Sequence, residues 1–105
     1  MKILILGAGK MGSFFTDLLS FDHEVAVLEN DPKRMRFIYN ALRLQSPEEV
    51  KDFNPELVIN CVTLSYTIEA FKAVMPYLQP YCIISDIASV KTYLKEFYET
   101  CGFPY

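Results

Sequence analysis

The chain has 105 residues, of which 51% are hydrophobic and 22% are charged, and its formal net charge is −3. This length fits one domain, and the apolar content is enough for a packed core. The negative charge disfavours nucleic acid and an anionic membrane as partners, because both bind basic surfaces. No apolar run reaches the length of a signal peptide or of a membrane span, so we predict a cytoplasmic protein.

The three cysteines lie far apart in the sequence, at Cys61, Cys82 and Cys101. They form no CxxC pair, and the single histidine, His23, cannot complete a zinc site with them. We therefore predict no metal site and three reduced thiols, as is usual inside cells. His23 precedes the second predicted strand and is expected in a surface loop.

The first predicted elements are a strand and a helix. Lys2–Leu6 is a continuous apolar run, which is typical of a strand buried on both faces of a parallel sheet. A helix follows, because apolar residues then recur at intervals of three and four positions and define one inward face. These residues are Met11, Phe14, Phe15, Leu18 and Leu19.

A second strand and a second helix come next. Glu24–Glu29 reads as a strand, and Asp31 and Pro32 then provide an N-cap and a proline at the first helical position. We expect this helix to run to about Leu42. Its predicted inward residues are Met35, Ile38 and Leu42.

The remaining strands are separated by further helices. Arg43–Gln45 is a candidate short third strand, and the spacing of Ser46 and Glu49 is that of a capping box at the start of a short helix. Leu57–Val62 and Tyr81–Ser85 are the next apolar strands. The helix between them is marked by Ile68, Phe71, Met75 and Leu78, and the last helix by Val90, Leu94, Phe97, Tyr98 and Cys101.

This alternation defines the fold class. Strands joined by helices of this length imply right-handed crossovers and a parallel sheet. We predict an α/β fold of the Rossmann type, a doubly wound parallel sheet with helices on both faces, formed as one domain by residues 1–105. Gly102 is well placed to end the last helix. We expect the sheet to be truncated near its sixth strand.

Three glycines follow the first strand directly and carry a specific spacing. Gly7-x-Gly9-x-x-Gly12, between a strand and a helix, is the dinucleotide-binding fingerprint. Gly7 would allow a tight turn, Gly9 would let a pyrophosphate approach the backbone, and Gly12 would let the helix pack closely. Lys10 and Met11 lie within the motif and are predicted cofactor contacts. The alternative is a glycine-rich turn that binds no ligand.

An acidic residue ends the second strand, as the fingerprint requires. Glu29 would accept hydrogen bonds from the adenosine ribose and would repel the 2′-phosphate of NADP. We therefore predict NAD as the cofactor in preference to NADP, with Asn30 as a neighbouring contact. Asn30, Lys33 and Arg34 could form a phosphate pocket instead, so this preference stays open.

The loops after the fourth and fifth strands belong to the same predicted site, because ligands bind at the carboxyl ends of such strands. Val62, Thr63 and Leu64 are the expected contacts in the first loop, where Ser65 is expected to cap the following helix. The second loop lies in Ser85–Lys91, "SDIASVK".

In this second loop, Asp86, Ser89 and Lys91 cluster at the same edge of the sheet. Ser89 is predicted as a cofactor contact. On position alone, Ser89 could equally cap the last helix, and Lys91 could be a solvated residue of its first turn.

The stretches "ILILGAGKMGSFF" and "SDIASVK" together resemble the N-terminal NAD(P)-binding domain of the prephenate dehydrogenase family, including its arogenate-using relatives. The resemblance covers essentially the whole chain. It implies an oxidoreductase that converts prephenate to 4-hydroxyphenylpyruvate in tyrosine biosynthesis, with a small ring acid as substrate and a homodimer as the full-length form. It also implies that Ser89 supports the catalytic histidine near the nicotinamide and that Asp86 holds its loop in shape.

The chain departs from that family in two respects. The family's His-Pro-Met-x-Gly segment, which carries the catalytic histidine, follows the sixth strand, and this sequence ends before it. The helical substrate and dimerisation domain is also absent. We therefore expect cofactor binding without turnover by these 105 residues. The alternatives are the cofactor domain of another two-domain NAD(P)-dependent reductase and a stand-alone nucleotide sensor.

Overall fold

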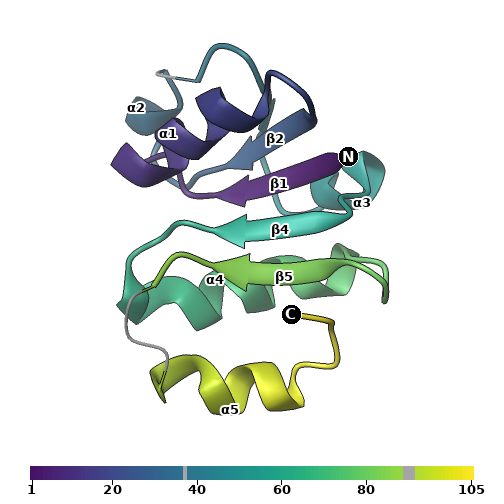
Figure 1. Ribbon diagram of the computed structural model, residues 1–105. Coiled ribbons are helices and arrows are strands. Elements are labelled where there is room, and N and C mark those ends of the chain that lie inside the picture. The colour runs from purple at the N-terminus through teal and green to yellow at the C-terminus, as the bar shows by residue number, and fades with distance from the viewer. Residues whose placement is uncertain (37, 89–91) are drawn as a thin grey trace.

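The computed structural model describes residues 1–36, 38–88 and 92–105. Its centre is one parallel sheet with the strand order β3-β2-β1-β4-β5 (Figure 1). The strands are β1 (Lys2–Leu6), β2 (Glu24–Leu28), β3 (Leu42–Leu44), β4 (Leu57–Asn60) and β5 (Ile83–Asp86). The predicted Rossmann-type α/β fold is confirmed.

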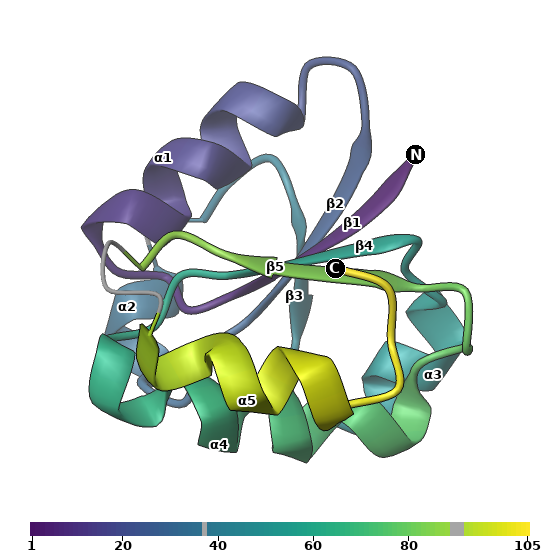
Figure 2. The same cartoon turned by 60° about the horizontal axis from the view of Figure 1, so that its bottom comes forward.

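Helices cover both faces of the sheet. They are α1 (Lys10–Leu19), α2 (Pro32–Met35), α3 (Glu49–Phe53), α4 (Thr67–Val74) and α5 (Thr92–Thr100), with short 3₁₀ turns η1 (Leu64–Tyr66) and η2 (Met75–Tyr77). Figure 2 shows α1 on one side of the sheet and α3, α4 and α5 on the other. In the described ranges, no helix is long and apolar enough to cross a membrane.

The continuous apolar sequence of β1 supplies both cores, because alternate side chains of a strand point to opposite faces. Ile3 and Ile5 pack in the core under α1, together with half-buried Phe15 and Leu19. Leu4 and Leu6 belong to the second core, on the side of α3, α4 and α5. All four of these side chains are at most 2% exposed, so β1 anchors the glycine turn that follows it in the core.

The direction of winding reverses between β1 and β4. β1 pairs with β2 on one side and with β4 on the other, and Leu6 lies opposite Asn60. The chain segments that leave these two strands therefore diverge at the same edge of the sheet. Such a reversal point is where open α/β sheets bind their ligands.

The second helix is much shorter than predicted. α2 ends at Met35, and Leu42 is not on its inner face but on β3, where it is 54% exposed. Ile38 is buried as predicted, but it reaches the core from a turn. The Arg43 side chain donates two hydrogen bonds to the carbonyl of Ile38, which is therefore satisfied outside a helix.

The inward face of α1 also differs from the prediction. Phe15 and Leu19 do pack on the core, but Met11, Phe14 and Leu18 are about half exposed. The physical reason is the close contact of Gly12 with the turn before the helix. This contact fixes the rotation of α1 about its own axis, so that the side with Gly12 and Thr16 faces the sheet.

Smaller differences concern helix ends. α3 begins at Glu49 and not at the predicted Ser46, and Ser65 lies inside η1 and is not the N-cap of a helix. Gly102, with φ of +83°, follows the last helix as predicted. The backbone N–H of Ile84 donates to the carbonyl of Pro104, so the chain end runs beside β5 (Figure 1).

Cys61, Cys82 and Cys101 are all free. His23 lies in the turn before β2, half buried, at the end of that strand remote from its carboxyl terminus. It is therefore far from the edge of the sheet where β1 and β4 diverge.

Candidate functional site

Two of the three glycines are required by the turn itself. Gly7 has φ of +97°, and a Cβ on it would lie 3.1 Å from Val62 Cγ1 and 3.3 Å from the carbonyl carbon of Cys61. A Cβ on Gly12 would lie 2.0 Å from the carbonyl oxygen of Gly7. These contacts match the tight turn and the close helix packing that the spacing predicts.

Gly9 differs, because packing does not demand a glycine there. Its backbone is extended, and among the described atoms the nearest to an added Cβ is Arg34 Nη1, at 3.7 Å. Gly9 is also the N-cap of α1, whose described first turn contains no acidic residue and whose cap makes no side-chain hydrogen bond. The start of α1 therefore presents backbone N–H groups and a partial positive charge to an open space.

That space is a cleft of about 810 Å³ at the carboxyl edge of the sheet. Its lining residues come from the glycine turn, the end of β2, α2 and the loops after β4 and β5. They are Gly7, Gly9, Lys10, Met11, Glu29, Asn30, Arg34, Cys61, Val62, Thr63, Tyr66 and Ile87. The structure thus brings together most of the residues predicted as cofactor contacts.

Three predicted contacts do not line this cleft. Gly12 is buried against the turn, and Leu64 lies in η1, outside the lining. Ser89, with its neighbours Val90 and Lys91, lies outside the described residues. Cys61, Tyr66 and Arg34 line the cleft but were not predicted as NAD contacts. Cys61 was assigned to the interior of the predicted strand Leu57–Val62, and Arg34 was considered only for the alternative phosphate pocket.

The Glu29 carboxylate is held in a fixed position at the rim. Oε1 accepts a hydrogen bond of 2.8 Å from the backbone N–H of Ala8, and Oε2 accepts one of 3.0 Å from that of Asp31. Arg34 Nη1 lies 3.8 Å from Oε1. Glu29 therefore ties the end of β2 to the glycine turn and keeps its remaining lone pairs at the cleft.

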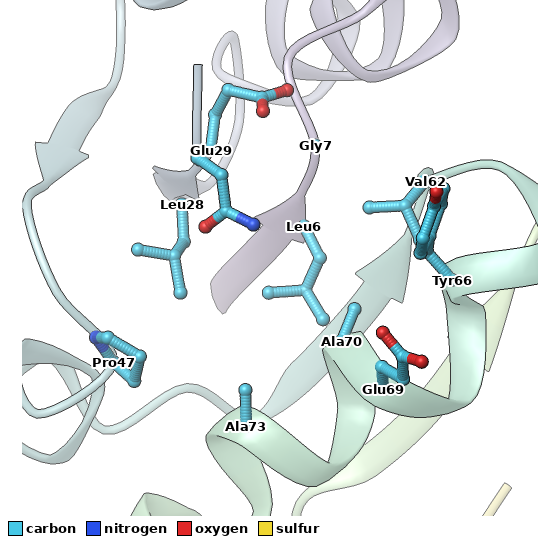
Figure 3. Close-up of a pocket in the computed structure, with 11 residues that line it drawn as sticks. Leu6, Gly7, Leu28, Glu29, Pro47, Val62, Tyr66, Glu69, Ala70 and Ala73 are labelled. Atoms are coloured by element: carbon cyan, nitrogen blue, oxygen red, sulfur yellow. The ribbon is translucent and has the colours of Figure 1, made fainter. Parts of the chain in front are cut away.

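A smaller apolar cavity of about 280 Å³ adjoins the cleft (Figure 3). Leu6 and Leu28 approach it from the sheet, Val62 from the loop after β4, and Ala70 and Ala73 face it from α4 below. Other lining residues are Pro47, Asn30, Tyr66 and Glu69, and Gly7, Glu29, Asn30, Val62 and Tyr66 also line the larger cleft. The two spaces form one groove, with a polar part over the glycine turn and an apolar part beside it.

The loop after β4 is shaped by a buried amide. Asn60 is 1% exposed, and its Nδ2 donates to the carbonyl of Thr67 at 2.9 Å. Its Oδ1 accepts from the backbone N–H of Val62 at 3.2 Å. Asn60 was not among the predicted site residues, although a polar residue at the end of an apolar strand is a usable signal.

Asp86 holds the start of the loop after β5, as the resemblance implies. Its Oδ1 accepts from the backbone N–H of Ala88 at 2.7 Å, and its Oδ2 accepts a hydrogen bond from the hydroxyl of Tyr98 on α5. Burial, followed by the hydrogen bond and the charge of Asp86, raises the pKa of Tyr98 well above its ordinary value.

Tyr98→Phe should destabilise the fold at neutral pH by about 1–3 kcal/mol, because the charge-assisted hydrogen bond from the Tyr98 hydroxyl to the Asp86 carboxylate is lost. The folded state holds the Tyr98 proton more tightly than the unfolded state, so this stability is complete below about pH 10 and falls above it. Urea unfolding at pH 8 and pH 10.5 should therefore show that the free energy of unfolding differs less between wild type and variant at the higher pH. An unchanged difference would contradict this assignment.

The cleft contains one thiol, and it is not prepared for nucleophilic chemistry. Burial raises the pKa of Cys61 to about 11, so the reactive thiolate is scarce near neutral pH. Within the described residues, no three potential metal ligands cluster together. The chemistry available in the cleft is anion binding by α1 and hydrogen bonding by Glu29, with Lys10 and Arg34 as nearby cations.

Comparison with known proteins places the fold. The structure matches an arogenate dehydrogenase from Synechocystis (TM-score 0.80, 23% identity, 98% of this chain and 39% of that one). It matches a 3-hydroxyisobutyrate dehydrogenase from Mycobacterium tuberculosis (TM-score 0.81, 20% identity, 98% and 38%). It also matches a prephenate dehydrogenase from A. aeolicus in complex with hydroxyphenyl propionate and NAD+ (TM-score 0.75, 22% identity, 90% and 38%). No protein-family model and no curated protein matches the sequence.

These similarities define the class of fold. The chain has the Rossmann-type fold found in several dehydrogenases that act on different substrates. It spans less than two fifths of the length of each of these three proteins.

Proposed function

We propose that the chain binds NAD in the groove over its glycine turn and serves as the cofactor domain of an oxidoreductase. The observation that carries this proposal is the open N-terminus of α1 above Gly9, flanked by the fixed carboxylate of Glu29. A packed strand–helix turn needs Gly7 and Gly12, but it has no use for the open space at Gly9. That space fits a phosphate group that approaches the backbone.

The groove has a suitable environment for each part of a dinucleotide. The pyrophosphate would be bound by N–H groups at the start of α1, and the adenosine ribose would donate hydrogen bonds to Glu29. The adenine would occupy the apolar cavity between Leu28 and Ala70 (Figure 3). Val62 lines both spaces, and Thr63 lines only the larger cleft, so the second ribose would lie beside Thr63.

The enzyme class that we favour is a prephenate or arogenate dehydrogenase, acting in tyrosine biosynthesis on a small ring acid. This is supported by the "SDIASVK" stretch and by the arogenate and prephenate dehydrogenases among the matched structures. Ser89 would then lie near the nicotinamide and support a catalytic histidine supplied from outside these residues. The full-length enzyme would be a cytoplasmic homodimer with a helical substrate domain, and residues 1–105 would bind cofactor without turnover.

A second candidate is the cofactor domain of a different dehydrogenase. The 3-hydroxyisobutyrate dehydrogenase matches with a TM-score of 0.81, so the fold does not favour either substrate class. Arg34, 3.8 Å from Glu29, also offers a cation to the 2′-phosphate of NADP. We favour NAD because the neighbouring carboxylate of Glu29 would repel that phosphate.

Calorimetric titration with NAD and NADP tests the proposal. NAD should bind more tightly, and Glu29→Gln should weaken NAD binding by about 1–3 kcal/mol because one ribose acceptor is lost. NADP binding should weaken less, so the preference for NAD falls. Glu24→Gln is the matched control, since Glu24 is exposed at the other end of β2. If neither dinucleotide binds, the proposal fails, and if Glu29→Gln leaves the preference unchanged, the role of Glu29 is wrong.

A further inference from the structure

The outer face of α1 exposes a row of large apolar side chains. Met11, Phe14 and Leu18 on α1 and Phe21 just beyond it are 46%, 55%, 54% and 86% exposed. Their spacing of three, four and three positions puts the first three on one side of the helix and continues toward the fourth. We name these four residues the α1 stripe.

The α1 stripe is separate from the face that holds the helix on the sheet. The buried residues of α1 are Gly12 and Thr16, and half-buried Phe15 and Leu19 pack on the core beside them. Single exposed apolar residues are normal on protein surfaces, but a contiguous set of large ones marks an interaction surface. The helix therefore has two apolar surfaces. The prediction that Met11, Phe14 and Leu18 face inward was wrong, because these residues belong to the outer surface.

The charges beside the stripe indicate which partner fits it. Lys10 starts α1 and Asp17 lies near its end, both exposed, and successive positions on the helix place both along one edge of the stripe. This arrangement is the reverse of what the helix dipole favours, which is acid at the start and base at the end. An antiparallel copy of the same helix would compensate it, because Lys10 of each copy would lie beside Asp17 of the other.

We propose that the α1 stripe is a self-association surface on which two copies of this chain pack their α1 helices antiparallel across a two-fold axis. Such an interface is self-complementary, as a two-fold interface must be. Phe14, in the middle of the helix, lies near the axis, and the Lys10–Asp17 pairs flank it on the same side. This proposal does not require dinucleotide binding, but Lys10 and Met11 also line the cleft, so a bound dinucleotide and a second copy would share these two residues.

Sedimentation equilibrium of the chain without nucleotide, from about 1 to 500 μM, tests it first. The wild type should pass from monomer to dimer within this range. Phe14→Glu should weaken association at least about tenfold, because a central apolar contact is replaced by a charge. Tyr39→Glu is the matched control, since Tyr39 is an exposed aromatic residue outside the stripe. A wild-type monomer at every concentration, or an equal effect of both variants, would overturn the proposal.

Charge reversal tests the antiparallel arrangement separately. Lys10→Glu and Asp17→Lys should each weaken the dimer about threefold to tenfold, because each places like charges together. The double variant should return to within about twofold of wild type, since the cross-pairs are restored with opposite polarity. Failure of the double variant to recover, with circular dichroism unchanged, would overturn the antiparallel pairing.

Discussion

Gly12→Ala should destabilise the protein by about 3 kcal/mol and should abolish dinucleotide binding. The added Cβ would lie 2.0 Å from the carbonyl oxygen of Gly7, and the clash is with backbone, which has no rotamer to change. Either α1 must move away from the sheet or the glycine turn must open. Urea unfolding measures the loss of stability, and titration with NAD measures the loss of binding.

Gly9→Ala provides the informative control for this prediction. Its Cβ would enter open space, 3.7 Å from the end of a flexible arginine side chain, so stability should change by less than about 1 kcal/mol. Dinucleotide affinity should still fall strongly, because the methyl group occupies the approach to the start of α1. If Gly9→Ala binds NAD as well as wild type does, the phosphate does not approach there.

Asn60→Ala should lower the free energy of unfolding by about 2–4 kcal/mol, an effect comparable to that of Gly12→Ala. The substitution removes the acceptor for the Val62 N–H and the donor to the Thr67 carbonyl, and it leaves a cavity at a position that is 1% exposed. The loop that carries Val62 and Thr63 would then lose its fixed shape, so NAD affinity should fall as well.

Asn30→Ala is the matched control for Asn60→Ala, because Asn30 is an exposed asparagine that lines the groove, whereas Asn60 is buried under the loop after β4. Its unfolding free energy should stay within about 0.5 kcal/mol of wild type. Chemical denaturation of the wild type and both variants gives the unfolding free energies to be compared. Equal stabilities for Asn60→Ala and Asn30→Ala would show that the buried amide does not hold the loop.

The sequence was sufficient to predict the parts of the fold that depend on local pattern. The apolar run of β1 and the glycine spacing after it predicted a buried strand, a tight turn and a close helix, and the contacts of Gly7 and Gly12 agree. Glu29 was predicted at the rim of the site because the dinucleotide fingerprint calls for a carboxylate at the end of the second strand. Its hydrogen bond to Ala8 was not predictable, since it joins residues 21 positions apart.

What failed depended on particular contacts that hydrophobic periodicity does not register, although they join residues only five positions apart. Periodicity extended α2 to Leu42, whereas the Arg43 side chain takes the carbonyl of Ile38 and the helix ends at Met35. Periodicity also could not separate the two apolar surfaces of α1, because only the contact of Gly12 with the turn determines which side faces the sheet.

Amide NMR shifts of isotope-labelled protein, recorded during titration with NAD, report directly on whether the dinucleotide binds over the glycine turn. We expect saturable shifts in residues 7–12, 29–31 and 61–64, at and around the cleft, and their loss in Gly9→Ala. Shifts confined to another surface, such as the groove between α4 and α5 lined by Ile68 and Phe97, would contradict it. So would the absence of any saturable shift at the glycine turn.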